Sequence, residues 1–244
     1  MEKMEVLKKE LTAFLKKQGA GLVGVGSLEG IVSGEWKTGI SVAIPEPKHI
    51  IRQLQTAPTR EYLEEYRLLD QQLDEIVLCG EQFLRERGFQ AAANTTARIT
   101  KDEEWRTALP HKTVATRAGL GWIGKSCLLV TETFGSAVRI SSLLTDALLP
   151  ADMSVTESKC KDCRICVEKC PAGALTGALW EPSVSREELF DRISCRETQI
   201  CLMEEATGIA TDLCGICFAF CPYTLRYLNG ESEERTADGS NSFF

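Results

Sequence analysis

The chain has 244 residues, of which 43% are hydrophobic and 26% are charged, and its formal net charge at pH 7 is −7. These values are ordinary for a globular protein and predict one full-sized domain with a small second one. No stretch approaches the roughly 18 consecutive apolar residues that a membrane-spanning helix needs. The acidic charge argues against a nucleic acid as the main partner, because nucleic-acid-binding domains usually present a basic face.

Three segments in the first half have apolar residues at helical spacing. Residues 1–18 mix lysine and glutamate with one apolar face, which predicts a packed surface helix and not a targeting peptide. Residues 59–87 carry the longest such pattern, and Gly88 ends it. Residues 109–118 predict a further helix, which precedes a glycine-rich loop.

Short apolar segments between these helices predict strands. They are bounded by glycine and proline, as strands of a buried sheet usually are. The segments are residues 21–26 (a short strand or turn), 39–44, 89–94, 126–131 and 138–145. The last two are predicted to form an antiparallel pair around Phe134 and Gly135.

This alternation predicts the domain organisation. Residues 1–150 are expected to form an α/β (α+β) domain of three layers with a mixed sheet. Residues 150–158 are interpreted as a polar linker, and residues 159–228 as a small cysteine-rich domain that depends on bound metal for part of its stability. Residues 229–244 are polar and charged, so disorder is expected there.

The most specific feature of the chain is the run Cys160-x2-Cys163-x2-Cys166-x3-Cys170-Pro171. It has the spacing of the bacterial ferredoxin motif, in which three cysteines ligate one [4Fe-4S] cluster and the fourth ligates another. Zinc sites use cysteine pairs but do not need this run, and disulfide frameworks suit small secreted domains. The run therefore predicts iron–sulfur clusters and one-electron chemistry.

A second run, Cys214-x2-Cys217-x3-Cys221, repeats the end of the first but lacks one cysteine. Either Cys195 or Cys201 can supply it, and spacing alone hardly separates the two. We expect crossed ligation, which brings the clusters close together for electron transfer. One cluster is predicted on Cys160, Cys163, Cys166 and Cys221, and the other on Cys170, Cys214, Cys217 and Cys195 (or Cys201). Eleven cysteines also favour a reducing, cytoplasmic location.

The second unusual element is the glycine-rich loop RAGLGWIGK at residues 117–125. Three glycines in six residues let the backbone approach a ligand closely. The spacing is not that of a phosphate-binding loop, and the loop follows a helix and precedes a strand, which is the reverse of a dinucleotide-binding motif. It is interpreted as a wall against a bulky cofactor, with contacts from Arg117, Gly119, Gly121, Trp122, Gly124 and Lys125. Cys127, just beyond it, is interpreted as a buried core thiol.

The RAGLGWIGK loop, the strand that ends in Leu144-Thr-Asp146, and the two cysteine runs together resemble the epoxyqueuosine reductase family over most of residues 5–228. The resemblance implies two [4Fe-4S] clusters and a cobalamin bound by the N-terminal domain, a core shared with reductive dehalogenases. It also implies Cys195 rather than Cys201 as the eighth ligand, because in the family that cysteine lies at the start of a helix.

The chain departs from this family in two respects. The tRNA-modifying members carry an acid shortly before the glycine-rich loop, and the corresponding position here is Trp105. The helical-repeat extension of many members is also not matched, so the resemblance implies a short, divergent relative. Candidate catalytic residues are Glu104, which could replace the acid, and His111 and Lys112, which precede the expected cofactor pocket.

These patterns lead to one main interpretation and two alternatives. The main one is an iron–sulfur oxidoreductase that passes single electrons from an external low-potential donor through both clusters to a corrinoid, and so reduces an unidentified substrate. The first alternative is an electron-transfer or activator protein that reduces the redox centre of a partner protein. The second is an epoxyqueuosine reductase that acts on tRNA.

Overall fold

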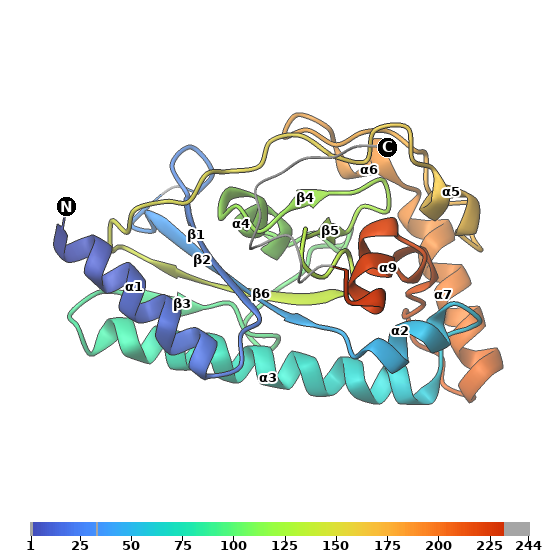
Figure 1. Cartoon of the computed structure of the whole chain (residues 1–244), viewed down its shortest axis with the longest axis horizontal. Coiled ribbons are helices and arrows are strands. Elements are labelled where there is room, and N and C mark those ends of the chain that lie inside the picture. The colour runs from blue at the N-terminus through green and yellow to red at the C-terminus, as the bar shows by residue number, and fades with distance from the viewer. Residues whose placement is uncertain (1, 33, 232–244) are drawn as a thin grey trace.

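The computed structural model of the chain describes residues 2–32 and 34–231 (Figure 1). The predicted disorder of the tail falls almost entirely on residues 232–244, which lie outside the described residues. The helices are α1 (Glu2–Lys17), α2 (Lys48–Leu54), α3 (Arg60–Arg85), α4 (His111–Arg117), α5 (Ile165–Lys169), α6 (Arg186–Leu189), α7 (Arg192–Thr207), α8 (Ile216–Ala219) and α9 (Pro222–Asn229). The strands are β1 (Leu22–Ser27), β2 (Thr38–Pro45), β3 (Ala91–Ala93), β4 (Trp122–Ile123), β5 (Leu129–Val130) and β6 (Val138–Thr145).

Four strands form the main sheet, in the order β1-β2-β6-β3. All three strand pairs are antiparallel, so the expectation of a mixed sheet is wrong in this respect. Strands β2 and β3 are joined through helices, as parallel neighbours are, and they run in the same direction. They are not neighbours, however, because β6 lies between them and pairs with both.

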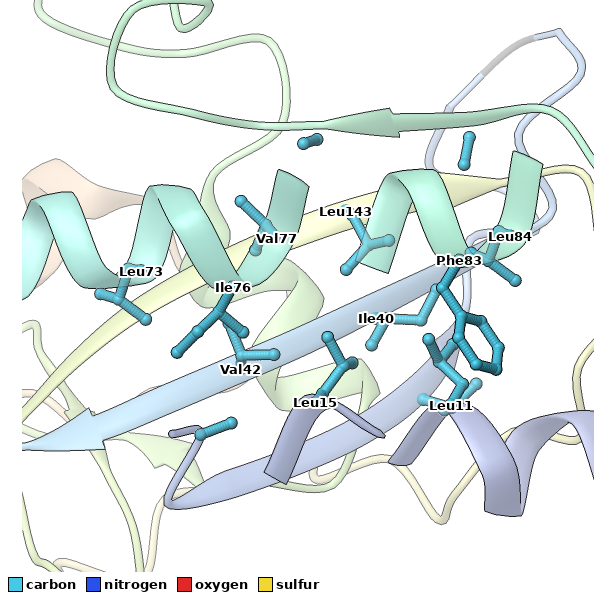
Figure 2. Close-up of a cluster of buried hydrophobic side chains, with 14 of the residues drawn as sticks. Leu11, Leu15, Ile40, Val42, Leu73, Ile76, Val77, Phe83, Leu84 and Leu143 are labelled. Carbon is cyan, nitrogen blue, oxygen red and sulfur yellow. The ribbon is translucent and has the colours of Figure 1, made fainter. Parts of the chain in front are cut away.

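The predicted α/β class and its three layers are confirmed. Helices α1 and α3 cover one face of the sheet, and α4 packs on the other (Figure 1). Figure 2 shows the first interface, where side chains of α1 and α3 meet those of β2 and β6. Leu11 and Leu15 project from α1, and Ile76 from α3, at the helical spacing that the sequence predicted. Thr59 caps α3 by accepting a hydrogen bond from the Tyr62 N–H.

The opposite face of the sheet lets α4 approach closely because β1 carries glycines. A Cβ atom on Gly24 would lie 2.2 Å from the Ala118 carbonyl oxygen, and one on Gly26 would lie 2.7 Å from the Arg117 carbonyl carbon. Side chains at these two positions would push the end of α4 away from the sheet. The glycines of β1 therefore fix the position of α4, and with it the start of the glycine-rich loop.

The expected pairing of residues 126–131 with residues 138–145 is wrong. Strand β5 pairs with β4 in a separate two-stranded sheet, whereas β6 enters the main sheet. An isolated bridge joins Thr131, at the end of the first segment, to Gly135 in the turn that follows it. The C-terminal half of β6 is buried on both faces because this strand lies in the interior of the main sheet.

The C-terminal segment, from α5 to α9, shares a hydrophobic core with the N-terminal half. Ile50 and Leu54 from α2 and Tyr62 from α3 pack with Met203 from α7 and Phe218 from α8. Residues 150–158 have no regular secondary structure, yet Asp152 within them binds the Lys8 Nζ at 2.6 Å and accepts from the Val25 N–H at 2.8 Å. Within residues 2–32 and 34–231, no helix is both long and apolar enough for a membrane crossing.

Candidate cofactor and cluster site

A cavity of about 940 Å³ lies where the sheet domain meets the cysteine-rich segment. Its wall includes residues of α3, α4 and β6 on one side and residues that precede and follow α7 on the other. Ligand pockets usually have volumes of about 300–1,000 Å³, so this cavity is at the large end of the range. It can hold a bulky organic ligand.

The first group of thiols joins the two cysteine runs. Burial, and after it the charges of Cys160, Cys221 and Cys163, raise the pKa of Cys166 to about 12. Burial also raises the pKa of Cys221, with smaller effects from Cys160 and Cys163. Cys221 from the second run therefore lies beside the three opening cysteines of the first run.

The second group contains Cys170, Cys195, Cys214 and Cys217. Burial raises the pKa of Cys217 well above its usual value, and the charges of Cys214, Cys166, Cys195 and Cys170 raise it further. Burial likewise raises the pKa of Cys214 to about 11, with contributions from Cys195 and Cys170. All four of these cysteines line the cavity.

Cys201 stands apart from both groups. Its side chain is exposed on α7, and its Sγ lies 3.5 Å from Glu205 Oε1. Cys195, in the first turn of the same helix, lies beside the second group instead, with its Sγ 2.9 Å from Gln199 Nε2. The thiols are thus grouped in the way crossed ligation through Cys195 requires, and the role of each cysteine as a ligand stays a prediction.

The two groups match the ligands of two four-iron clusters. In the part of the chain that the structure describes, no three Cys, His, Asp or Glu side chains lie close enough together to hold a single metal ion. A zinc ion with Zn–S bonds of 2.3 Å draws its sulfurs to within about 3.8 Å of one another. A cubane cluster separates its thiolates more widely, because each iron binds its own cysteine. Positive iron would also offset the cost of burying thiolates whose free pKa is raised.

The end of the glycine-rich loop supports the first group of thiols. Lys125 is buried, and its Nζ donates a hydrogen bond to the Lys161 carbonyl oxygen at 2.7 Å, within the first cysteine run. A Cβ atom on Gly124 would lie 3.5 Å from Cys160 Sγ. Trp122 is buried and packs edge-on against Tyr223. These contacts fix the chain around Cys160.

Of the six loop residues predicted to contact a cofactor, only Arg117 lines the cavity. Gly119 and Gly121 serve close packing, because a Cβ atom on them would lie 2.7 Å from the Met153 carbonyl oxygen and 2.0 Å from the Val130 carbonyl oxygen, respectively. Gly119 also has a positive φ of 71°, which favours glycine. The structure places Trp122, Gly124 and Lys125 behind the cavity wall as well.

His111, a candidate from the sequence, lines the cavity and carries no charge at neutral pH. Its Nδ1 lies 2.9 Å from Ser142 Oγ. Burial, and after it the positive charge of Arg139, lower the pKa of His111 to about 4. The imidazole is therefore a neutral hydrogen-bonding group in the wall.

Lys112 lines the cavity next to Cys127. Its Nζ donates a hydrogen bond to the Cys127 carbonyl oxygen at 2.6 Å and lies 3.6 Å from the Cys127 Sγ. Cys127 is buried, as predicted, but it also contributes to the cavity wall. Lys112 thus places an ammonium group at the cavity while holding the loop that follows Gly124.

Glu104 is not part of the cavity wall, in contrast to Trp105 and Arg106 beside it. Its carboxylate is half exposed and pairs with Arg106 at 3.2 Å. Trp105 has a positive φ of 56°, and the guanidinium groups of Arg192 and Arg196 each lie 4.8 Å from the centre of its ring. Arg106 also pairs with Glu187 at 2.8 Å, so this loop is held against α6 and α7.

Two charged residues that the sequence analysis did not identify also line the cavity. Glu46 directly follows β2 and is only 1% exposed, and burial is the main reason that its pKa is raised to about 7. Arg139 lies in β6, pairs with Asp70, and stacks its guanidinium 3.6 Å from the centre of the Tyr66 ring. The end of β2 and the start of β6 thus bring a buried acid and a partly buried cation to the same cavity.

Comparison with known proteins agrees with these features. A family model described as "4Fe-4S double cluster binding domain" matches residues 159–224. The epoxyqueuosine reductase of Bacillus anthracis is 40% identical over 67 residues, which are 28% of this chain and 17% of that protein. The epoxyqueuosine reductase of Synechococcus sp. is 34% identical over 128 residues, which are 51% of this chain and 38% of that protein. The chain therefore spans well under half the length of these curated relatives.

Solved structures share the fold of the chain. An epoxyqueuosine reductase crystallised with an epoxyqueuosine-modified tRNA stem loop has a TM-score of 0.61 at 20% identity, covering 94% of this chain and 69% of that one. A reductive dehalogenase, whose structure was reported for its B12-dependent mechanism, has a TM-score of 0.66 at 16% identity, covering 93% of this chain and 34% of that one. The resemblance seen in the sequence is confirmed: the chain is similar to epoxyqueuosine reductases in sequence, and residues 159–224 match a double [4Fe-4S] cluster binding domain.

Proposed function

We propose that the chain is a reductase in which electrons pass singly through two clusters into the cavity, whose wall would hold a corrinoid that supplies the redox chemistry for the substrate. The observation that carries this proposal is the position of the second group of thiols, because all four line the cavity. The first group lies behind them, with Cys166 close enough to Cys217 to affect its pKa. An external low-potential donor would reduce the first cluster, and the second cluster would deliver each electron to the ligand.

The cavity suits a corrinoid in size and in the chemistry of its wall. Basic residues outnumber acidic ones there, although the whole chain has a net charge of −7. The basic residues are Arg106, Lys112, Arg117, Arg139 and Arg186, against the acidic residues Glu46 and Asp212. Lys112 and Arg117 would hold the anionic or amide groups at the edge of the ligand, and neutral His111 would bind an amide without adding charge. When bound, the corrinoid would supply the cobalt centre for reductive bond cleavage.

The substrate class with most support is an epoxide carried on tRNA. Curated relatives are epoxyqueuosine reductases, and a structural neighbour was solved with a modified tRNA stem loop. Arg106, Arg139 and Arg186 are paired with carboxylates, so the positive charge that the wall offers a polyanionic substrate comes from Lys112 and Arg117. Reduction of an epoxide to an alkene consumes two electrons, and two one-electron clusters can deliver them one after the other.

Anaerobic assay of the purified, cluster-loaded chain tests this proposal. It should be mixed with cobalamin, a reduced low-potential one-electron donor, and an epoxyqueuosine-modified tRNA stem loop. We expect queuosine in the stem loop, and we expect none when cobalamin is omitted. Protein that is folded and cluster-loaded but converts no stem loop would contradict the proposal. If it then reduced a corrinoid protein rapidly, the electron-carrier alternative would be favoured.

A further inference from the structure

Glu46 places a buried carboxyl group in the cavity wall. It follows the last residue of β2, its backbone N–H donates to the Ala137 carbonyl oxygen at 2.9 Å, and its side chain lines the cavity. The Oε2 atom is fully buried and has no hydrogen-bond partner among the described residues. A buried polar oxygen without a partner is costly in a folded protein. Arg139, which also lines the cavity, has a buried Nε without a partner among the described residues, so a polar ligand group that reaches either atom would remove an unsatisfied hydrogen-bonding site.

The groups around Glu46 come from three elements. Burial is the main cause that raises the pKa of Glu46 to about 7; Arg139 opposes the rise, and the charges of Glu65 and Asp70 add to it. The carboxyl therefore holds a proton about half of the time at neutral pH. The titratable and charged side chains that face it are Arg139 from β6, Tyr62, Glu65 and Asp70 from α3, and Tyr227 from α9, whose hydroxyl donates to the Glu46 carbonyl oxygen at 3.3 Å.

Other candidates lack one of the properties of a proton donor. Trp105 occupies the position where the family resemblance places an acid, but it carries no carboxyl group. Glu104 does not line the cavity, and Asp212 lines it with a side chain that is 57% exposed. His111 has a pKa of about 4 and holds no extra proton at neutral pH. Glu46 combines burial, an unpartnered oxygen and a place in the wall.

We propose that Glu46 is the proton donor to the substrate that is reduced in this cavity, an inference that rests on the proposed function. Reduction of an epoxide to an alkene consumes two electrons and two protons and releases one water. Both electrons come from the external one-electron donor through the clusters. The carboxyl proton of Glu46 goes to the epoxide oxygen as a carbon–oxygen bond breaks, and Arg139 offsets the carboxylate charge that results. The second proton, which completes the water molecule, comes from solvent.

The first test needs no substrate. Glu46→Gln keeps the shape of the side chain but cannot release a proton, and Glu75→Gln removes an exposed carboxyl from α3 as a matched control. Infrared spectra should be recorded from pH 5 to pH 9 on the cluster-loaded chains. We expect the carbonyl stretch of one protonated carboxyl to disappear near pH 7 in the wild type and in Glu75→Gln, and to be absent from Glu46→Gln. Spectra that are the same in all three chains would overturn the proposal.

The second test is a single turnover of the epoxyqueuosine-modified tRNA stem loop by the cobalamin-loaded protein. We expect Glu46→Gln to lower the rate constant at least about 100-fold, as loss of a general acid does, with iron content, cobalamin uptake and stem-loop binding unchanged. Glu46→Asp, which retains an acid, should be slowed less. The wild-type rate should fall as pH rises above about 7, because the carboxyl is then ionised.

The outcomes separate the two proposals. A wild-type protein that converts the stem loop, together with a Glu46→Gln variant of equal rate and equal pH profile, overturns the proton-donor role and leaves the proposed function intact. A wild-type protein that converts no stem loop overturns the proposed function, and the proton-donor role falls with it. A Glu75→Gln variant that is as slow as Glu46→Gln would assign the effect to charge at a distance, which also contradicts the proposal.

Discussion

Cys195 and Cys201 lie on the same helix, α7, but their thiols have different surroundings. Cys195 lies beside Cys170 and Cys214, whereas Cys201 is exposed. A hydrogen bond to Glu205, and then the charge of that carboxylate, raise the pKa of Cys201. The pKa of Cys195 is raised as well, so position and exposure, and not the pKa, distinguish the two thiols. Sequence spacing does not show which of the two cysteines is the eighth ligand, but their surroundings in the structure favour Cys195.

Serine substitution distinguishes their roles. We expect Cys195→Ser to lose the second cluster, so that iron falls from about eight to about four atoms per chain after anaerobic reconstitution. The matched variant Cys201→Ser should retain about eight iron atoms. Iron analysis and electron paramagnetic resonance measure both. A Cys201→Ser chain that loses iron while Cys195→Ser keeps it would contradict the grouping.

Local spacing predicted the cysteine groups but not the other cavity residues. The cysteine runs have a fixed spacing because each tight loop must wrap one cluster. Glu46 lies between two prolines, and the sequence of this segment indicates only that a strand ends there. Arg139 lies in an apolar strand, and a charged side chain that is buried there must be paired. The sequence does not show where this side chain points, because its partners Asp70 and Tyr66 are distant in sequence.

At the scale of elements, helix α4 and strand β1 position one wall of the cavity. His111 and Lys112 stand at the start of α4, and the end of α4 rests directly on Gly24 and Gly26. The end of α4 can therefore lie this close to β1 only because Gly24 and Gly26 have no side chains. A change in β1 should affect the cavity through α4, although β1 itself does not line the cavity.

Gly24→Ala tests this contact. Its Cβ would overlap the Ala118 carbonyl oxygen, so we expect a loss of about 1–3 kcal/mol, as overpacking usually costs. The apparent melting temperature should fall by about 2–4 °C for each kcal/mol. Gly30→Ala is the control, because Gly30 has a positive φ of 75° but open space around it, and should cost about 1–2 kcal/mol from backbone strain alone. Gly24→Ala should also weaken cobalamin binding, whereas Gly30→Ala should not. Equal cobalamin binding by both variants would argue against a spacing role.

Within the described residues, the sequence pattern predicted three of the nine helices and five of the six strands, but not the order of the strands. Residues 59–87 and 1–18 were predicted as helices because their apolar residues recur on one face, and α3 and α1 follow them closely. The partner of β6 was predicted wrongly, because residues 126–131 are its neighbour in sequence. In the structure β6 pairs along both edges, with eight residues of β2 and three of β3, while α3 and α4 contact it as well. A neighbour in sequence would have paired with one edge only.

For the whole molecule, the cluster segment and the sheet domain depend on one core. Met203 from α7 is fully buried among residues of α2, α3 and α8. The two halves are therefore expected to unfold together, and cluster loss should accompany unfolding of the sheet domain. A break in this core would also change the cavity, which is lined by residues from both halves.

Two methionine substitutions test this coupling. We expect Met203→Ala to destabilise the chain by about 2–5 kcal/mol, as large-to-small core substitutions do, and to release iron at the same temperature as its helices unfold. Met153→Ala, at a side chain that is 89% exposed, should change neither property. Circular dichroism and cluster absorbance, recorded during the same heating, provide the comparison. Iron release well below the unfolding of the sheet domain would show that the halves are independent.

The central claim is that the second cluster delivers electrons to a corrinoid in the cavity. The most direct test is electron paramagnetic resonance of anaerobically purified, cluster-loaded protein before and after cobalamin is added. We expect about eight iron atoms per chain, a bound cobalt(II) signal, and broadening of that signal, or its loss as cobalt(II) becomes cobalt(I), when the clusters are reduced. Cys195→Ser should bind cobalamin without this change. A cluster-loaded protein that takes up no cobalamin, or a cobalt signal that cluster reduction does not affect, would contradict the account.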